Sequence, residues 1–241
     1  MKMKSLSISV ALLAAFDAYK CQSSPEIVPV NGGVSGNGTT TRYWDCCKPS
    51  CGWLIPETNE QVPVQSCAVD GVTPIDSNAQ SGCDASGSAY TCTNQQPWVI
   101  NDTLAYGFVA ASFTGGVDNH KCCACVLLSF QGQLEGKQLL AQITNTGDPL
   151  AENHFDIALP GGGVGIYNLG CISQWNAPEN GWGERYGGIN SETECSELPD
   201  ALQPGCKFRF EFMEGVPNPP VTFYEVQCPR ELSEITNCVS A

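Results

Sequence analysis

The cysteines constrain the fold of this chain more than any other feature of its sequence. There are 15 of them in 241 residues, and all except Cys21 lie between Cys46 and Cys238. Setting Cys21 aside leaves an even number, which is compatible with seven disulfide bonds, although spacing alone does not determine their connectivity. Disulfides persist in oxidising compartments. The sequence therefore predicts a secreted protein whose loops are tied together covalently.

The N-terminal segment supports the same interpretation. Residues 1–21 resemble an export signal with an approximate cleavage point: Lys2 and Lys4 give a charged start, and residues 6–16 form an apolar run too short to span a bilayer. The large residues just before Cys21 argue against a lipoprotein anchor. No other stretch approaches the ~20 apolar residues of a membrane helix. We expect an extracellular protein without a membrane partner.

One domain follows the signal. Residues 22–39 are rich in Gly, Ser, Asn and Pro without apolar periodicity, which predicts a flexible lead-in. The folded domain is then expected over residues 40–241, because Cys238 lies close to the C-terminus. A length of about 200 residues suits a single compact unit, and we expect a monomer.

The local patterns are mostly those of β-structure. Strands are predicted at 125–130, 207–212 and 222–228, and helices at 102–112, 191–198 and 231–237. Short strands with abundant Gly and Pro favour a closed barrel with long disulfide-pinned loops over a layered α/β sheet.

The charge balance narrows the class of partner. There are 11 basic and 25 acidic residues, which gives a formal net charge of −14. Such a surface repels nucleic acids and acidic polysaccharides, so a neutral or cationic partner is favoured.

Two short segments each present an aspartate beside polar side chains. If the segment TRYWD is a strand, alternation places Thr41, Tyr43 and Asp45 on one face. In NHFDIALP, the same rule sends the apolar residues to the core and His154 and Asp156 to the opposite face. Separate strands would thus display a carboxyl group each.

Two carboxyl groups on rigid strands are what a glycosidase requires. One protonates the departing oxygen, and the other activates water or attacks carbon. A sugar ring also packs its C–H face on an aromatic ring, and Trp53 is the best candidate for such a platform. The alternative, that Asp45 and Asp156 only cap turns or face solvent, is open on pattern alone.

Other chemistries fit the sequence less well. The even cysteine count and the presence of only two histidines, His120 and His154, argue against a metal site. A serine hydrolase is disfavoured because no GxSxG motif occurs. We therefore expect no cofactor.

Taken together, the motifs resemble those of the glycoside hydrolase family 45 endoglucanases over about residues 40 to 238. They are TTRYWDCCKPSCGW at 40, SGC at 81, PWVIND at 97, CCAC at 122, NHFD at 153, PGGGVGI at 160, RYGGI at 185, LPDALQPGC at 198 and VQCP at 226. The resemblance implies a six-stranded double-psi β-barrel with an open groove that hydrolyses internal β-1,4 bonds of cellulose with inversion. By the same resemblance, Asp45 is the expected catalytic base and Asp156 the expected catalytic acid.

The resemblance also assigns the groove. Its substrate-binding positions correspond here to Thr41, Tyr43, Lys48, Trp53 and His154. The chain departs from the family where a further loop aspartate is usual seven residues before the acid, because that position is Pro149. Asp148, one position away, is the candidate auxiliary carboxylate.

The family connectivity further implies seven disulfides. The pairs would be Cys46–Cys171, Cys47–Cys83, Cys51–Cys122, Cys67–Cys92, Cys123–Cys238, Cys125–Cys228 and Cys195–Cys206. Two alternatives to a cellulase remain. One is an expansin-like protein that binds or loosens cell-wall polymers without hydrolysis, and the other is an enzyme of the same mechanism that prefers xyloglucan or glucomannan.

Overall fold

The computed structural model describes residues 25–54, 62–115, 121–147 and 152–239. Its strands are β1 (Ser35–Tyr43), β2 (Ser66–Cys67), β3 (Tyr90–Thr91), β4 (Trp98–Asn101), β5 (Leu104–Ser112), β6 (Cys125–Phe130), β7 (Gln138–Thr146), β8 (His154–Ala158) and β9 (Val221–Val226). The α-helices are α1 (Leu169–Trp175), α2 (Gln203–Glu211) and α3 (Arg230–Thr236), and the 3-10 turns are η1 (Ser50–Gly52), η3 (Gly132–Leu134) and η4 (Glu192–Glu197). The predicted export signal lies outside the described residues.

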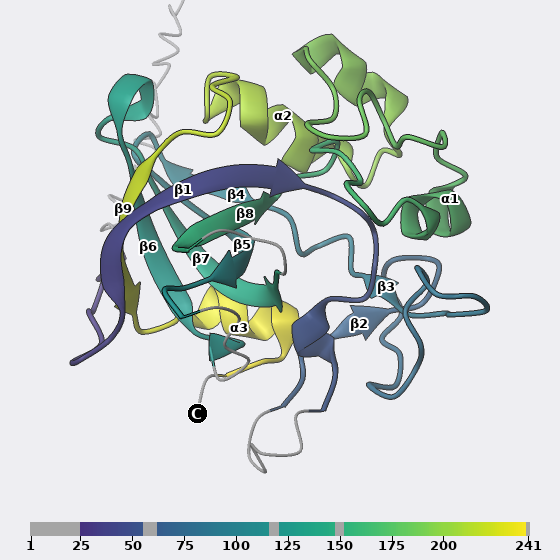
Figure 1. Ribbon diagram of the computed structural model, residues 1–241, viewed down its shortest axis with the longest axis horizontal. Helices are drawn as coiled ribbons and strands as arrows, with labels where there is room; N and C mark the ends of the chain where they lie inside the picture. Colours follow the sequence, from purple (N-terminus) through teal and green to yellow (C-terminus); the bar gives the residue numbers. More distant parts are fainter. Residues whose placement is uncertain (1–24, 55–61, 116–120, 148–151, 240–241) are drawn as a thin grey trace, which may run out of the picture.

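Six strands close into a barrel. They are paired in the order β5-β7-β6-β9-β1-β8, and a further pairing of β8 with β5 completes the ring, while β4 adds to the outer edge of β5. The pairs β1–β8 and β5–β7 are parallel and the others are antiparallel. Figure 1 shows β1 arching over β8, with α2 above the barrel and α3 below it. The predicted mainly-β, six-stranded barrel is confirmed.

The barrel is filled by apolar side chains. One buried cluster combines residues from β5, β6, β7, β8 and β9 with Phe208 and Phe212 at helix α2. Phe155 and Phe223 form an edge-to-face pair there, with ring centroids 4.8 Å apart. This packing holds β8 in place, and β8 carries Asp156.

Two sequence predictions of local structure are wrong. Within the helix predicted at 102–112, residues 104–112 instead form strand β5, because consecutive residues such as Leu104 and Ala105 belong to different apolar clusters. The spacing of four residues between Leu104 and Phe108 is compatible with both the helical period and the strand period. Residues 207–212 continue helix α2 and are not a strand, because Phe208 and Phe212 stack one turn apart, with centroids at 5.1 Å.

The flexible lead-in predicted at 22–39 is too long. Strand β1 already begins at Ser35, and the amide of Val30 donates to the carbonyl of Glu225 at 3.0 Å. The composition was misleading because this half of β1 is largely exposed and needs no apolar face. Gly38 is required by close approach, since a β-carbon there would lie 2.6 Å from the carbonyl oxygen of Asn153.

The seven predicted disulfides are all present in the described chain. Several link the barrel to the loops beside it, and each such closure stabilises by roughly 2 to 4 kcal/mol. The helix predicted at 231–237 is α3, and the one at 191–198 is the 3-10 turn η4. Among the described residues, no helix has the length and apolar content needed to cross a membrane.

Candidate active site

A single cleft brings the two predicted aspartates together. Its volume is about 600 Å³, and both Asp45 and Asp156 contribute to its lining. The cleft runs past the ends of β1, β7 and β8 and is bounded by the loop after β8. The other lining residues used below are Tyr43, Lys48, Trp53, Asp84, Asn145, Ile166 and Tyr167.

Asp45 lies just beyond the end of β1 and is held by covalent and backbone contacts. The next residue, Cys46, adopts the left-handed conformation with φ of 62°, so the chain turns sharply away from the strand. Disulfides from Cys46 to Cys171 and from Cys47 to Cys83 fix that turn. The amide of Cys47 donates to Oδ1 of Asp45 at 2.9 Å. Asp45 is only 9% exposed, so its carboxyl group has a defined position without any helical support.

Asp156 is positioned by the pairing of β8 with β1. Thr41 lies in register with it, and the Thr41 hydroxyl donates to Oδ1 of Asp156 at 2.7 Å. Nε2 of His154 lies 2.7 Å from the same hydroxyl. When Asp156 is protonated, the order of donors can reverse, with the carboxyl group donating to Thr41 and Thr41 donating to His154. The chain can therefore accommodate Asp156 in either protonation state.

The surroundings favour the protonated forms of both carboxyl groups. Burial, with a smaller contribution from the neighbouring charge of Asp156, raises the pKa of Asp45 from 3.8 to about 7 against the opposing hydrogen bond from Cys47. Burial likewise raises the pKa of Asp156 to about 6, opposed by the hydrogen bond from Thr41 and the charge of Arg42. Near neutral pH both groups are therefore close to their pKa values, and the charge of ionised Asp156 disfavours ionisation of Asp45.

Tyr43 contributes a phenol that stays neutral. Burial, followed by the charge of Asp45, raises its pKa well above the ordinary value of 10. Asn145 accepts at Oδ1 from the amides of Ser50 and Thr146, which directs its Nδ2 to the Tyr43 oxygen at 3.3 Å. Because the phenol oxygen accepts this bond, its own hydrogen remains available for donation in the cleft.

Lys48 supports Trp53 at the wall of the cleft. Its ammonium lies over the Trp53 ring, 3.2 Å from the centroid, and donates to the carbonyls of Ser77 and Ala79. Lys48 is only 5% exposed, and burial lowers its pKa to about 8. The contacts indicate a side chain that holds the aromatic platform, in addition to lining the groove.

The comparisons with known proteins bear directly on this arrangement. A family model described as glycosyl hydrolase family 45 matches residues 37–239. The chain belongs to glycosyl hydrolase family 45. The match includes both cleft aspartates and most of strand β1, which agrees with a folded unit that begins before residue 40.

Relatives of this family 45 domain are similar over nearly their whole length. The chain is 58% identical over 227 residues to an endoglucanase of Phaedon cochleariae, covering 94% of this chain and 91% of that protein. It is 50% identical over 210 residues to an endoglucanase of Cryptopygus antarcticus, covering 87% and 92%. The crystal structure of a cellulase from the Antarctic springtail Cryptopygus antarcticus superposes with a TM-score of 0.81 at 48% identity, over 86% of this chain and 99% of that one.

Some of the predicted site residues line the cleft, and others lie behind its lining. Tyr43, Lys48 and Trp53 line it directly. Thr41 reaches it through its hydrogen bond to Asp156, and His154 lies one step further away, against the Thr41 hydroxyl. The candidate auxiliary carboxylate, Asp148, lies outside the described residues.

Sequence reasoning missed several residues of the cleft. Asn145 stands at the end of β7 and orients Tyr43, while Ile166 and Tyr167 follow the glycine-rich turn. Tyr167 is 55% exposed, so an aromatic ring is displayed at the rim. An exposed tyrosine after PGGGVG was the one available signal, because sugar rings pack against such surfaces.

The raised pKa values predict how stability depends on pH. The folded pKa values of Asp45 and Asp156 exceed the ordinary 3.8, so the folded protein holds more protons than the unfolded chain above about pH 4. Stability from this pair is therefore lost as pH rises towards 7. We expect Asp45→Asn to raise the free energy of unfolding at pH 8 by roughly 1 to 4 kcal/mol, with little gain at pH 4.

Chemical denaturation at both pH values measures this difference. The exposed aspartate Asp102, in the turn between β4 and β5, provides the matched control, and Asp102→Asn is expected to change stability little at either pH. An equal gain from Asp45→Asn at pH 4 and pH 8 would contradict the assigned pKa.

Proposed function

We propose that the protein is a secreted, monomeric endo-β-1,4-glucanase that hydrolyses internal bonds of cellulose or a related neutral β-glucan with inversion. The observation that carries this proposal is the pair of aspartates, Asp45 and Asp156, in one cleft of about 600 Å³. Asp156 is held on β8 and Asp45 by the disulfide-fixed turn just after β1, and both carboxyl groups have a raised pKa. Membership of family 45 and the endoglucanase names of close relatives support the same activity.

The proposed roles follow from the hydrogen bonds of each carboxyl group. Asp45 accepts from a backbone amide, which favours the ionised form that a base requires. It removes a proton from a water molecule that attacks the anomeric carbon. Asp156 carries the proton, supported by Thr41, and donates it to the departing glycosidic oxygen. The attack and the departure take place on opposite faces of the sugar, so the configuration inverts.

The walls of the cleft suit a neutral sugar polymer. Trp53 and Tyr167 offer aromatic faces for the C–H surface of glucose rings, and the Tyr43 phenol offers a donor for a hydroxyl group. The net charge of −14 suits an uncharged substrate and disfavours an acidic one.

Proton NMR of the first product from cellohexaose tests the proposal. We expect internal cleavage, with the α-anomer appearing before mutarotation. Rates of release of new reducing ends from amorphous cellulose, xyloglucan and glucomannan then rank the substrates. A preparation with intact disulfides that released no reducing ends from any β-glucan would contradict hydrolysis and favour a polymer-loosening protein.

A further inference from the structure

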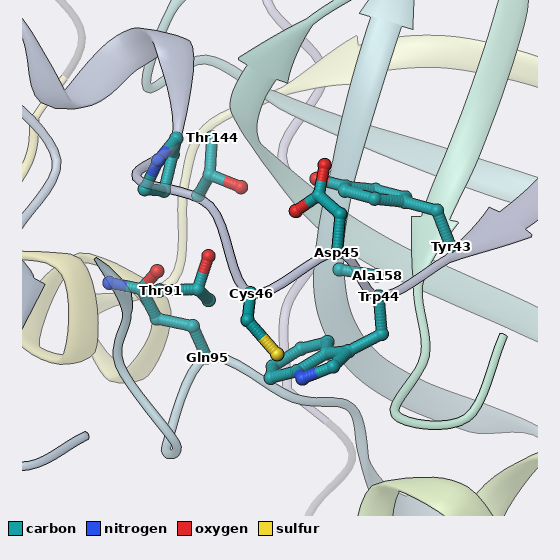
Figure 2. A pocket seen from close by; sticks show the side chains of 9 residues that line it. Tyr43, Trp44, Asp45, Cys46, Thr91, Gln95, Thr144 and Ala158 are labelled. Atoms are coloured by element: carbon teal, nitrogen blue, oxygen red, sulfur yellow. The ribbon is translucent and has the colours of Figure 1, made fainter. Parts of the chain in front are cut away.

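A second, much smaller cavity lies behind Asp45. Its volume is about 10 Å³, which is close to the space that one water molecule requires. Asp45 and Tyr43 line both spaces, so this smaller cavity adjoins the cleft. Figure 2 shows the carboxyl group of Asp45 and the hydroxyl group of Thr144 pointing towards each other across it.

Gln95 brings an unpartnered acceptor to this cavity. Its side chain is 1% exposed and lines the cavity together with Asp45. Its Nε2 donates to the carbonyl of Gln65 at 2.6 Å, which fixes the orientation of the amide. Within the described part of the chain, Oε1 of Gln95 is buried without a hydrogen-bond partner. A buried acceptor of this kind is ordinarily satisfied by protein or by ordered water.

The remaining polar groups complete a set of partners for one water. Thr144, on β7, is 3% exposed and contributes a hydroxyl group that can donate. The hydroxyl group of Thr91 also lines the cavity, but it donates to the carbonyl of Cys47 at 2.6 Å. A buried water typically makes about three hydrogen bonds, and Thr144, Gln95 and Asp45 supply one donor and two acceptors.

We propose that this cavity binds a single water molecule that accepts a hydrogen bond from Thr144 and donates to Gln95 Oε1 and to the Asp45 carboxylate. Gln95 and Thr144 are then positioning residues for the base, acting through the water. The functional part of this inference rests on the proposed role of Asp45 as base, whereas the binding site itself does not.

The water affects which of the two aspartates holds a proton. Burial raises the pKa of Asp45 to about 7 and that of Asp156 to about 6, so the protein contacts alone favour a proton on Asp45 at least as much as on Asp156. The reaction needs the opposite distribution. A hydrogen bond donated to ionised Asp45 stabilises its charged form and moves the proton towards Asp156.

The protein groups around Asp45 supply only part of this effect, because the Cys47 amide already donates to Oδ1 and the pKa of Asp45 is still raised to about 7. Tyr43 from β1 and Asp156 from β8 face it, and the charge of Asp156 opposes ionisation of Asp45. Lys48 and Asp84 line the same cleft, but the Lys48 ammonium is bound to two carbonyls and the Trp53 ring. The interior water is therefore the donor available to Asp45 from the side away from substrate.

The pH profile of kcat/KM for Thr144→Val tests the functional effect. Without the donor, the water is held poorly and Asp45 is harder to ionise. We expect kcat/KM to fall about 3- to 10-fold below the pH optimum and to change little above it, where Asp45 is already ionised. Gln95→Met, which removes the acceptor, is expected to have the same asymmetric effect. A purely structural defect would lower activity on both sides of the optimum.

Thr236→Val provides the matched control. Thr236, on α3, is also a fully buried threonine and donates to Gln142 Oε1 at 2.7 Å, but it does not line this cavity. Its loss should destabilise the protein while leaving the shape of the pH profile unchanged. A symmetric loss of activity in both Thr144→Val and Gln95→Met would overturn the positioning role.

High-resolution crystallography of the wild-type protein tests the site independently of activity. We expect one ordered solvent peak within hydrogen-bonding distance of Thr144 Oγ1, Gln95 Oε1 and the Asp45 carboxylate, and its loss or weakening in Thr144→Val. A wild-type cavity without solvent density would overturn the proposal. A wild-type protein that hydrolyses no β-glucan would instead contradict the proposed function, and the solvent peak would still decide whether the site exists.

Discussion

Asp156→Asn is expected to bind cello-oligosaccharides as tightly as the wild type while its turnover of cellulose falls by about 10²- to 10⁴-fold. The amide keeps the shape of the carboxyl group and can still meet the Thr41 hydroxyl, which lies 2.7 Å from Asp156 Oδ1. It has no acidic proton to give to the departing oxygen. Measuring kcat on amorphous cellulose together with Kd for cellohexaose separates the two effects.

A substrate with a better leaving group provides a second test of Asp156 as the acid. A cello-oligosaccharide with a dinitrophenyl group at its reducing end releases dinitrophenolate, a stable anion that needs little protonation. Asp156→Asn should therefore lose far less activity on this substrate. Asp102→Asn, in an exposed turn, is the control for a generic loss of one aspartate. Wild-type turnover on cellulose, or an equal loss on both substrates, would rule out Asp156 as the acid.

The parts of the fold that the sequence predicted are those with one dominant local pattern. The segment at 153–160 contains the predicted strand, β8, which displays Asp156 to the cleft because alternation separates a buried face from a cleft face. The segment at 41–45 is a strand only as far as Tyr43, and Asp45 lies two residues beyond the end of β1 but still lines the cleft. The segment at 102–112 was misassigned because Leu104 and Phe108 satisfy both a helical and a strand period. Its burial on both faces, which decides the matter, depends on neighbours far along the chain.

Other features had no local signal. The disulfide connectivity followed from family resemblance and not from spacing. Gln95 lies in a loop and Thr144 on a buried strand, and neither stands in a recognisable motif. Their relation to Asp45 arises only when the loop after β3 closes against β7 and the end of β1. Sequence reasoning could therefore identify the two aspartates of the cleft but not the buried polar groups that lie behind Asp45.

Asp45→Ala is expected to lower the rate of hydrolysis by a similar factor of about 10² to 10⁴. The reason differs from that for Asp156→Asn, and added azide distinguishes the two. Water needs a base to become a nucleophile, whereas azide is already anionic. Removing a side chain that contributes to the cleft also leaves room for the anion. We therefore expect azide to restore cleavage of cellohexaose in this variant and to yield an α-glycosyl azide, identified by proton NMR.

The same addition should not restore Asp156→Asn, because that variant fails at protonation of the leaving group and not at attack. A β-glycosyl azide from Asp45→Ala would place Asp45 on the side of the departing oxygen and contradict its role as base. An α-azide together with α-anomer from the wild type would exclude a covalent role as well, since a carboxylate nucleophile gives the wild type a β-product. The two products therefore fix both the face on which Asp45 acts and the manner in which it acts.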